Sequence, residues 1–410
     1  MHSNPNRQKD LEQFLQNHFG KDSYSITPIQ GDAGFRSYFR VKSQSDVAIQ
    51  DTQGCHPQAP NRHPEQHNRH PERSEGSSSK SGGYNDKKRH CLHQKPKLKE
   101  LDHSLHSGST QLPSVVEFGK SFILMDCPPS YCSIQPFIEI AHHLRSNAFP
   151  APEIIASDAD NGFIILEDFG DTSVKTLIKN SEPQAQESIY YLIVDLLVSI
   201  QDKAPPANLK TYDNGLLLSE LSLFEEWYIP HVLGRSLTDA ESFEYKTIWQ
   251  EILSNQAPLK ASIVLRDYHA ENIMYLENRH SINKLGLLDF QDALIGSPIY
   301  DLVSVLEDAR IKVPRLLALD CLSYFTETQK LNLEDVLTNY HILGAQRNSR
   351  ILGVFARKFM RDKNDNYLQY MPLVLKYLEQ DLSHPVMGKL RKWISKILLN
   401  VSEEGSTPSS

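Results

Sequence analysis

The stretch Ile263-Val-Leu-Arg-Asp-Tyr-His-Ala-Glu-Asn-Ile-Met-Tyr275 decides the fold. It places a polar cluster, Asp267-x-His269-x-x-Asn272, between two apolar runs. We expect the cluster on a tight loop between two short buried strands, because such walls fix the geometry of loop side chains. Further along, Leu285-Gly-Leu-Leu-Asp-Phe-Gln-Asp292 predicts another apolar strand, which ends in carboxylates.

These two segments together hold the residue types that phosphoryl transfer needs. A carboxylate must accept the proton of the acceptor hydroxyl, and an amide oxygen with a second carboxylate can hold Mg²⁺ against the phosphates. Asp267 fits the first role, and Asn272 and Asp289 fit the second. The alternative is that Asp and Asn here only stabilise turns, as they often do. Both segments in this order, after a strand-rich front, favour the chemical interpretation.

Outward from this centre, the amino-terminal part predicts strands and the carboxy-terminal part predicts helices. Short runs rich in aromatic and β-branched residues are typical of strands, and apolar residues at intervals of three and four are typical of helices. The sequence therefore predicts an α+β protein with two lobes. The expected strands are 23–29, 37–42, 121–126, 153–157 and 162–168, followed by helices from about residue 184, after an earlier helix at 136–145.

One segment, residues 43–116, stands apart from both lobes. It is rich in His, Pro, Ser, Gln, Lys and Arg, and it contains a degenerate repeat that begins at His56, His63 and His70. Such a composition cannot bury enough apolar area to offset the entropy of ordering a backbone, roughly 1–2 kcal/mol per residue. We expect a disordered insertion between the second and third strands. The alternative is a zinc site built from Cys55, His56, Cys91 and His93, although the spacing matches no zinc module.

Composition narrows the classes of function. The formal net charge of −8 argues against nucleic acid as the main partner, because phosphate backbones need a basic surface. No apolar run is long enough for a membrane span, and the first residues are polar where a signal peptide would be apolar. Five scattered cysteines fit a reducing cytoplasm. We expect a cytoplasmic, monomeric enzyme that acts on a small molecule and binds neither a membrane nor nucleic acid.

The Asp-x-His-x-x-Asn loop and the following Asp-bearing strand resemble those of the aminoglycoside phosphotransferases, relatives of the protein kinases. Further stretches resemble the branch that contains the anomeric N-acetylmuramate/N-acetylglucosamine kinases of bacterial cell-wall recycling. The resemblance covers roughly residues 10–43 and 117–380. The stretches are Gly31-Asp-Ala-Gly-Phe-Arg-Ser-Tyr-Phe-Arg-Val41, Ile123-Leu-Met-Asp-Cys-Pro-Pro129, Phe290-Gln-Asp-Ala-Leu294, Gly296-Ser-Pro-Ile-Tyr-Asp-Leu-Val-Ser304 and residues 343–357.

The resemblance implies a protein-kinase-like fold and an ATP-dependent sugar kinase. Residues 1–166 would form the small antiparallel β-sheet N-lobe, residues 167–395 the mainly helical C-lobe, and residues 396–410 a flexible tail. Asp267 matches the family's catalytic base, and Asn272 and Asp289 match its Mg²⁺ ligands. His269 matches a loop histidine that would order the loop. Asp301 would pack a helix under the loop, with a buried helix cap as the preferred interpretation.

ATP would contact both lobes. The turn that contains Gly31, Gly34, Phe35 and Arg36 is placed to cover the phosphates, and the backbone around Glu167 and Phe169 would pair with adenine.

Met125 and Asp126 stand on the third strand, where a protein kinase has a lysine that binds phosphate. The compared branch shares this feature. Arg36 is our first hypothesis for the replacing cation and Arg40 the second, with Glu139 as a possible ion-pair partner.

Four residues are candidates for the acceptor site. Gln291 and Asp292 follow the metal carboxylate directly, and Gln346 and Arg347 lie on a predicted carboxy-terminal helix, where an arginine suits the carboxylate of muramate. Ordinary turn polarity and a structural salt bridge are the respective alternatives. Two other functions stay open at this point: a kinase of an aminoglycoside, a choline-like molecule or another metabolite, and a nucleotide-binding protein without catalytic activity.

Overall fold

The computed structural model describes residues 5–29, 36–44, 47–48, 115–116 and 119–404. The chain divides into two units, residues 1–46 with 117–410, and residues 47–116. The second unit is described only at its ends, where β3 (Val47–Ala48) pairs antiparallel with β4 (Val115–Val116). Most of the expected disordered insertion therefore lies outside the described residues, and so do all four residues of the alternative zinc site.

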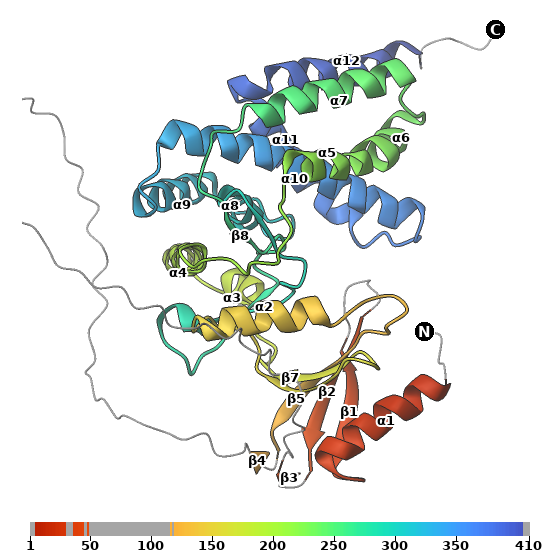
Figure 1. Ribbon diagram of the computed structural model, residues 1–410. Helices are drawn as coiled ribbons and strands as arrows, with labels where there is room; N and C mark the ends of the chain where they lie inside the picture. The colour runs from red at the N-terminus through yellow and green to blue at the C-terminus, as the bar shows by residue number, and fades with distance from the viewer. Residues whose placement is uncertain (1–4, 30–35, 45–46, 49–114, 117–118, 405–410) are drawn as a thin grey trace, which may run out of the picture. The chain divides into compact units, whose positions relative to one another are not determined.

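The amino-terminal part forms a five-stranded antiparallel sheet in the order β1-β2-β5-β7-β6 (Figure 1). The sheet confirms the strands that the sequence predicted. β2 and β5 pair directly, with Lys42 opposite Ser121, although residues 47–116 separate them in the chain. The strands are β1 (Tyr24–Ile29), β2 (Ser37–Ser43), β5 (Ser121–Asp126), β6 (Ile154–Asp158) and β7 (Phe163–Glu167).

The two faces of this sheet pack against different helices. On one face, Phe14 and Phe19 of α1 (Pro5–Phe19) contact Phe163 and Phe122, with ring centroids 5.5 Å apart in each pair. Strand residues alternate between faces, so Met125 and its neighbours on the other face join the main core with α2 (Gln135–Ser146). The sheet is thus covered on both sides, and α2 links it to the helical part.

The rest of the chain is mainly helical (Figure 1). Its longest helix, α10, packs against α8, α11 and the π-helical turn η1. Among the described residues, no helix is both long and apolar enough to cross a membrane. The helices are α3 (Val174–Lys179), α4 (Pro183–Gln201), α5 (Asn214–Glu220), η1 (Phe224–Tyr228), α6 (Ile229–Leu233), α7 (Asp239–Ser254), α8 (Ile299–Leu306), α9 (Arg315–Thr328), α10 (Leu333–Met360), α11 (Met371–Leu382) and α12 (Gly388–Glu404), with short 3₁₀ turns at Ser281–Lys284, Leu368–Tyr370 and Pro385–Met387.

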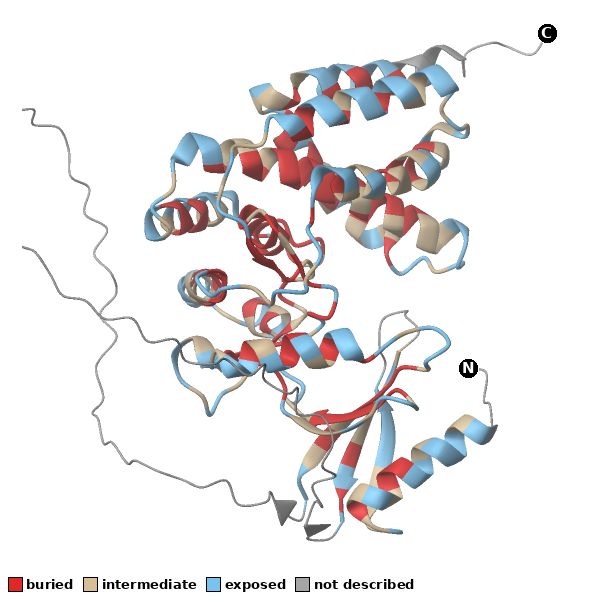
Figure 2. Cartoon of the chain, in the orientation of Figure 1, coloured by how far each residue is buried: buried red, intermediate tan, exposed pale blue. Residues whose placement is uncertain are grey.

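Two small antiparallel pairs frame the polar loop. β8 (Ser262–Val264) pairs with β11 (Leu294–Gly296), and β9 (Ile273–Tyr275) pairs with β10 (Leu285–Leu287). Every residue of α8 is buried, as the red ribbon in Figure 2 shows, and this agrees with a sequence that is apolar around most of the helix. The loop is therefore held between two short strand pairs and a fully buried helix.

The cysteine pattern did not predict one covalent link. Cys127 and Cys132, in the segment between β5 and α2, form a disulfide. Cys321 on α9 is buried, and burial raises the pKa of its thiol to about 12.

Candidate active site

The loop from Leu265 to Asn272 is held by backbone bonds and by two buried aspartates. The carboxylate of Asp301 on α8 accepts hydrogen bonds from the backbone N–H groups of Leu265 and Arg266, at 2.6 and 2.9 Å. Asp308, just beyond α8, accepts the N–H of Ala270 at 3.1 Å. Burial raises the pKa of both, that of Asp301 to about 7. Asp301 therefore anchors the loop rather than capping its own helix, whose N-cap is Pro298.

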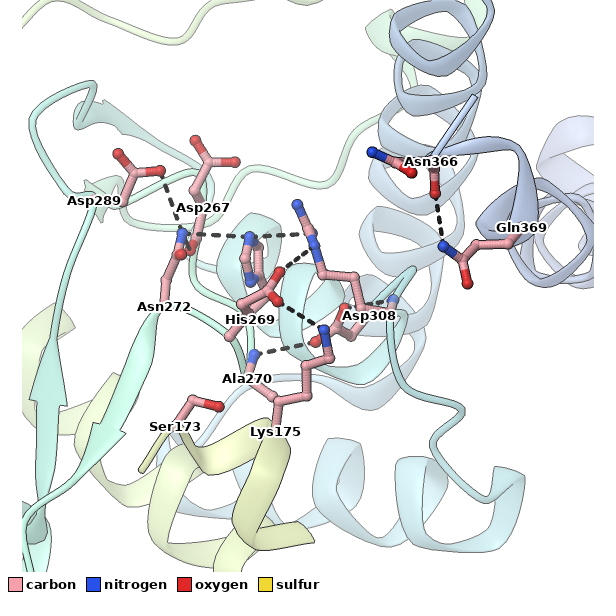
Figure 3. A network of polar contacts seen from close by, with 12 residues as sticks. Ser173, Lys175, Asp267, His269, Ala270, Asn272, Asp289, Asp308, Asn366 and Gln369 are labelled. Atoms are coloured by element: carbon pink, nitrogen blue, oxygen red, sulfur yellow. Dashed lines mark hydrogen bonds and ion pairs between the residues drawn. The ribbon is translucent and has the colours of Figure 1, made fainter. Parts of the chain in front are cut away.

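The loop and the strand that follows it bring together the three residues that the sequence singled out. The amide nitrogen Nδ2 of Asn272 lies 3.4 Å from Oδ2 of Asp289 and donates to the backbone carbonyl of Asp267 at 3.1 Å (Figure 3). Figure 3 shows the side chains of Asp267, Asn272 and Asp289 on the same side of the loop. The candidate proton acceptor and the two candidate oxygen ligands are thus neighbours.

His269 fixes the orientation of the Asn272 amide. Its ring nitrogen Nε2 lies 3.3 Å from Asn272 Nδ2, and the ring is only 4% exposed. Burial, together with the charges of Arg310, Arg347 and Lys175, holds the pKa of His269 well below its usual value. A neutral imidazole can accept at Nε2, so the Nδ2 hydrogens of Asn272 are directed inward and Oδ1 remains available for a cation.

Three charged residues support His269 from below. Glu271 binds Lys175 of α3 at 2.7 Å through Oε1 and Arg310 at 2.5 Å through Oε2. Arg310 Nη1 in turn lies 3.3 Å from His269 Nε2. Figure 3 shows Lys175 and Asp308 beneath the loop. The sequence analysis missed this network, because its members are far apart in the chain and no spacing connects them.

Asp289 and the two residues near it form a compact polar turn. Gln291 donates to Asp289 at 2.7 Å and to Asp292 at 3.3 Å. Burial raises the pKa of Asp289, and the charges of Asp267 and Asp292 add to the effect. Gln291 is buried and Asp292 is exposed. The structure therefore gives Gln291 a role in orienting Asp289, whereas Asp292 is open to solvent.

Arg36, the residue directly before β2, also approaches Asp289. Its Nη1 is 3.9 Å from Asp289 Oδ1. Tyr38 on the same strand shares a hydrogen bond with Arg36, and burial raises the pKa of Tyr38 to about 12, so the phenol stays protonated. Arg36 stays the first hypothesis for a phosphate-binding cation. Gly31, Gly34 and Phe35 lie outside the described residues.

The second candidate cation is engaged elsewhere. Arg40 binds Asp168 at 2.7 Å and Asp171 at 2.8 Å, both after β7. Met125 is buried on the sheet face that joins the main core. Glu139, which the sequence suggested as an ion-pair partner, is exposed and accepts a hydrogen bond from Gln135 at 3.0 Å. Of the two arginines, Arg36 is the one next to the candidate metal ligands.

The expected adenine-binding segment follows β7. The Glu167 carboxylate pairs with Arg279, and its backbone N–H donates to the Glu153 carbonyl at 2.8 Å. The ring of Phe169 packs on Gly286 of β10, where an added Cβ would come within 2.6 Å of the ring. This contact joins the segment after β7 to the strand that leads to Asp289.

The two α10 candidates for the acceptor site are buried. Gln346 is fully buried and donates from Nε2 to the Leu217 carbonyl at 2.9 Å. Arg347 is 4% exposed, and its charge contributes to the lowered pKa of His269. Both side chains therefore face the interior rather than solvent, and α10 is covered by α8, α11 and η1.

The donor set at Asn272 and Asp289 fits Mg²⁺. This ion takes oxygen ligands and is commonly held by one or two protein carboxylates, with substrate phosphates and water completing the shell. The Oδ1 atom of Asn272 accepts no hydrogen bond from another described residue, and the side chain of Asp289 is 45% exposed. Among the described residues there is no cluster of three His, Cys, Asp or Glu side chains that could hold a metal.

Comparison with known proteins gives the family. The model of the phosphotransferase enzyme family matches residues 107–330, more than half of the chain. The chain belongs to this family. The matched residues contain the whole loop, strand β10 that leads to Asp289, and α8 with its loop anchor Asp301.

Two similar phosphotransferases carry a more specific name. The N-acetylmuramate/N-acetylglucosamine kinase of Caulobacter vibrioides is 32% identical over 273 residues, which are 64% of this chain and 74% of that protein. The enzyme of the same name from Neisseria meningitidis serogroup B is 31% identical over 274 residues, 64% of this chain and 79% of that protein.

A solved structure confirms the fold of this phosphotransferase. The ethanolamine kinase of Plasmodium vivax superposes with a TM-score of 0.51 and 11% identity, and the match covers 89% of this chain and 86% of that one. The protein-kinase-like fold predicted from the sequence is therefore confirmed.

Proposed function

We propose that this phosphotransferase is an ATP-dependent sugar kinase that phosphorylates the anomeric hydroxyl of N-acetylmuramate or N-acetylglucosamine in cell-wall recycling. The observation that carries the proposal is the neighbourhood of Asp267, Asn272 and Asp289, with the amide of Asn272 3.4 Å from Asp289. The names of the relatives from Caulobacter and Neisseria support the choice of acceptor.

In this mechanism Asp267 binds and orients the acceptor hydroxyl. As the sugar oxygen attacks the γ-phosphorus of ATP, its proton passes to the Asp267 carboxylate and the bond from the γ-phosphorus to the bridging oxygen breaks. Asp301 and Asp308 hold the loop that carries Asp267 through three backbone N–H groups. The rate therefore depends on buried groups that touch neither substrate.

The phosphates would be held from two sides. Asn272 and Asp289 would bind Mg²⁺, which supplies positive charge to the β- and γ-phosphates when bound. Arg36 approaches from β2 and would contribute the charge that a strand lysine gives in protein kinases. The turn with Gly31, Gly34 and Phe35 would cover the phosphates with backbone N–H groups. The backbone from Glu167 to Phe169 would hold adenine.

The proposal also places the enzyme in the cytoplasm as a monomer with a small-molecule substrate. The net charge of −8 does not favour nucleic acid. Gel filtration with light scattering tests the oligomeric state, and free-thiol titration of protein from the cytoplasm tests the pairing of Cys127 with Cys132.

An acceptor screen tests the function. ATP consumption is measured with N-acetylmuramate, N-acetylglucosamine, other hexoses, choline and a panel of aminoglycosides, and ³¹P NMR identifies the phosphorylated position. We expect turnover of the two N-acetylated sugars and a product with phosphate on C1. Faster turnover of a cationic acceptor, or phosphate on another carbon, would refute the proposed acceptor. Binding of MgATP without turnover of any acceptor would indicate a non-catalytic protein.

A further inference from the structure

A cluster of two arginines and one glutamate lies beside the catalytic loop. Glu220, the last residue of α5, forms an ion pair with Arg266 and accepts a hydrogen bond from the Tyr212 hydroxyl. Arg350 of α10 joins from the other side, with Nε 3.4 Å from Glu220 Oε2. Because Arg266 directly precedes Asp267, the cluster borders the residue that would accept the proton of the acceptor hydroxyl.

The charged groups of the cluster are two guanidinium groups and the Glu220 carboxylate, with the Asp267 carboxylate nearby. Two guanidinium groups face one carboxylate, and burial raises the pKa of Tyr212, so this phenol stays neutral. Burial disfavours a charge on Arg350, yet its pKa is raised, because Tyr300, Glu220, Tyr212 and Asp267 surround it. Asp267 is thus within electrostatic reach of Arg350.

Arg350 has hydrogen-bonding capacity to spare. Its side chain is 23% exposed, and its contact with Glu220 is an ion pair at Nε. Among the described residues, no hydrogen-bond acceptor meets its two Nη groups, and neither of these atoms is fully buried. A guanidinium whose two Nη atoms have no acceptor presents the forked edge that binds a carboxylate with two parallel hydrogen bonds.

The two acceptors of the proposed function differ in charge. N-acetylmuramate carries a lactyl carboxylate that N-acetylglucosamine lacks. We infer that Arg350, held by Glu220, binds this carboxylate and sets the preference of the enzyme between the acidic and the neutral sugar. The inference rests on the proposed function. It assigns the carboxylate contact to Arg350 in place of the sequence candidate Arg347, which lies about one helical turn earlier on α10 and has a buried side chain.

The rival role of Arg350 is support of Asp267. Its positive charge could favour the ionised form of that carboxylate, and then both sugars would depend on it equally. A carboxylate contact instead affects the acidic sugar alone, and it acts on KM more than on kcat, because the contact exists before the transition state. The two roles therefore differ in one measurable ratio.

The test compares Arg350→Gln, Arg350→Lys and the control Arg361→Gln with the wild type. Arg361 is an exposed arginine that directly follows α10, and it pairs with Asp362 at 2.7 Å. For each protein, kcat/KM is measured with both sugars at two ionic strengths, and folding is checked by the thermal midpoint. Arg350→Lys keeps a cation near Glu220 and so protects the test against a folding failure of Arg350→Gln.

We expect the ratio of kcat/KM for N-acetylmuramate to that for N-acetylglucosamine to fall about 10- to 100-fold in Arg350→Gln, as for loss of one charge-assisted hydrogen bond. The ratio should fall less in Arg350→Lys and should not change in Arg361→Gln. Added salt should raise the wild-type KM for the acidic sugar only.

An unchanged ratio in a folded Arg350 variant, or a wild type that accepts only the neutral sugar, would overturn the inference and leave the sugar-kinase function standing. A wild type that phosphorylates neither sugar would overturn both.

Discussion

Replacing Asn272 by aspartate separates two roles that this side chain combines. As a metal ligand it needs an oxygen, which aspartate also supplies. As a hydrogen-bond donor it needs Nδ2, which donates to the Asp267 carbonyl at 3.1 Å and lies 3.3 Å from His269 Nε2 and 3.4 Å from Asp289 Oδ2. Aspartate would place an oxygen where all three neighbours present lone pairs.

The expected cost follows from these distances. Two negative charges 3.4 Å apart repel by about 1 kcal/mol in a water-like medium and by about 5 kcal/mol at an effective dielectric constant of 20. The Asp289 side chain is 45% exposed, so we take the lower part of this range. Loss of the hydrogen bond to Asp267 adds about 1 kcal/mol. Without metal, Asn272→Asp should therefore lose about 2–4 kcal/mol of unfolding free energy.

The assay is urea denaturation with EDTA, with Mg²⁺, and with MgATP. The deficit of Asn272→Asp should shrink in Mg²⁺, because a cation attracts both carboxylates. The control exchanges the two groups: Asn272→Asp/Asp289→Asn keeps one carboxylate and one amide, and it should recover most of the metal-free stability. Wild-type stability of Asn272→Asp in EDTA, or a double variant no more stable than the single one, would refute the hydrogen-bond reasoning.

Two more predictions concern other parts of the chain. Joining Lys42 to Gly119 through a short turn should leave the thermal midpoint and kcat/KM near wild type, because Lys42 already lies opposite Ser121 in the β2–β5 pairing. Loss of activity in a folded shortened protein, or sensitivity of the full-length protein to a zinc chelator, would contradict this prediction. Burial raises the pKa values of Glu307 and Asp381 well above normal, so the folded protein keeps protons that the unfolded chain releases above about pH 4, and its stability falls as the pH rises. The isosteric Asp381→Asn should therefore reduce the fall in thermal midpoint between pH 5 and pH 8. An unchanged fall would exclude the Asp381 carboxyl as its source.

The sequence predicted the parts of the site that depend on local order. Asp267, His269 and Asn272 lie within one loop, and Asp289 follows β10 of the next strand pair, so their order along the chain was enough to connect them. The sheet was predictable for the same reason, since its strands alternate or run apolar between clear turns. Even the pairing of β2 with β5 followed from treating residues 43–116 as an insertion.

The parts that the sequence did not predict depend on contacts between distant segments. Gln346 and Arg347 are polar residues on a helix whose solvent face could not be identified from spacing, because α10 is covered on several sides. Arg40 is paired with Asp168 and Asp171, which lie far along the chain. Asp301 was expected to cap a helix, but tertiary packing turns its carboxylate toward two loop amides.

The central claim is that Asp267 accepts the proton of the sugar hydroxyl, and the most direct measurement is phosphoryl transfer by Asp267→Asn. Rapid-quench single-turnover kinetics with N-acetylglucosamine, together with calorimetric titration of MgATP, separates the chemical step from nucleotide binding. The account predicts a transfer rate lower by about two orders of magnitude or more with nearly unchanged MgATP affinity, because the amide keeps the shape of the carboxylate but cannot accept the proton. A folded Asp267→Asn protein that transfers phosphate at close to the wild-type rate would contradict the account.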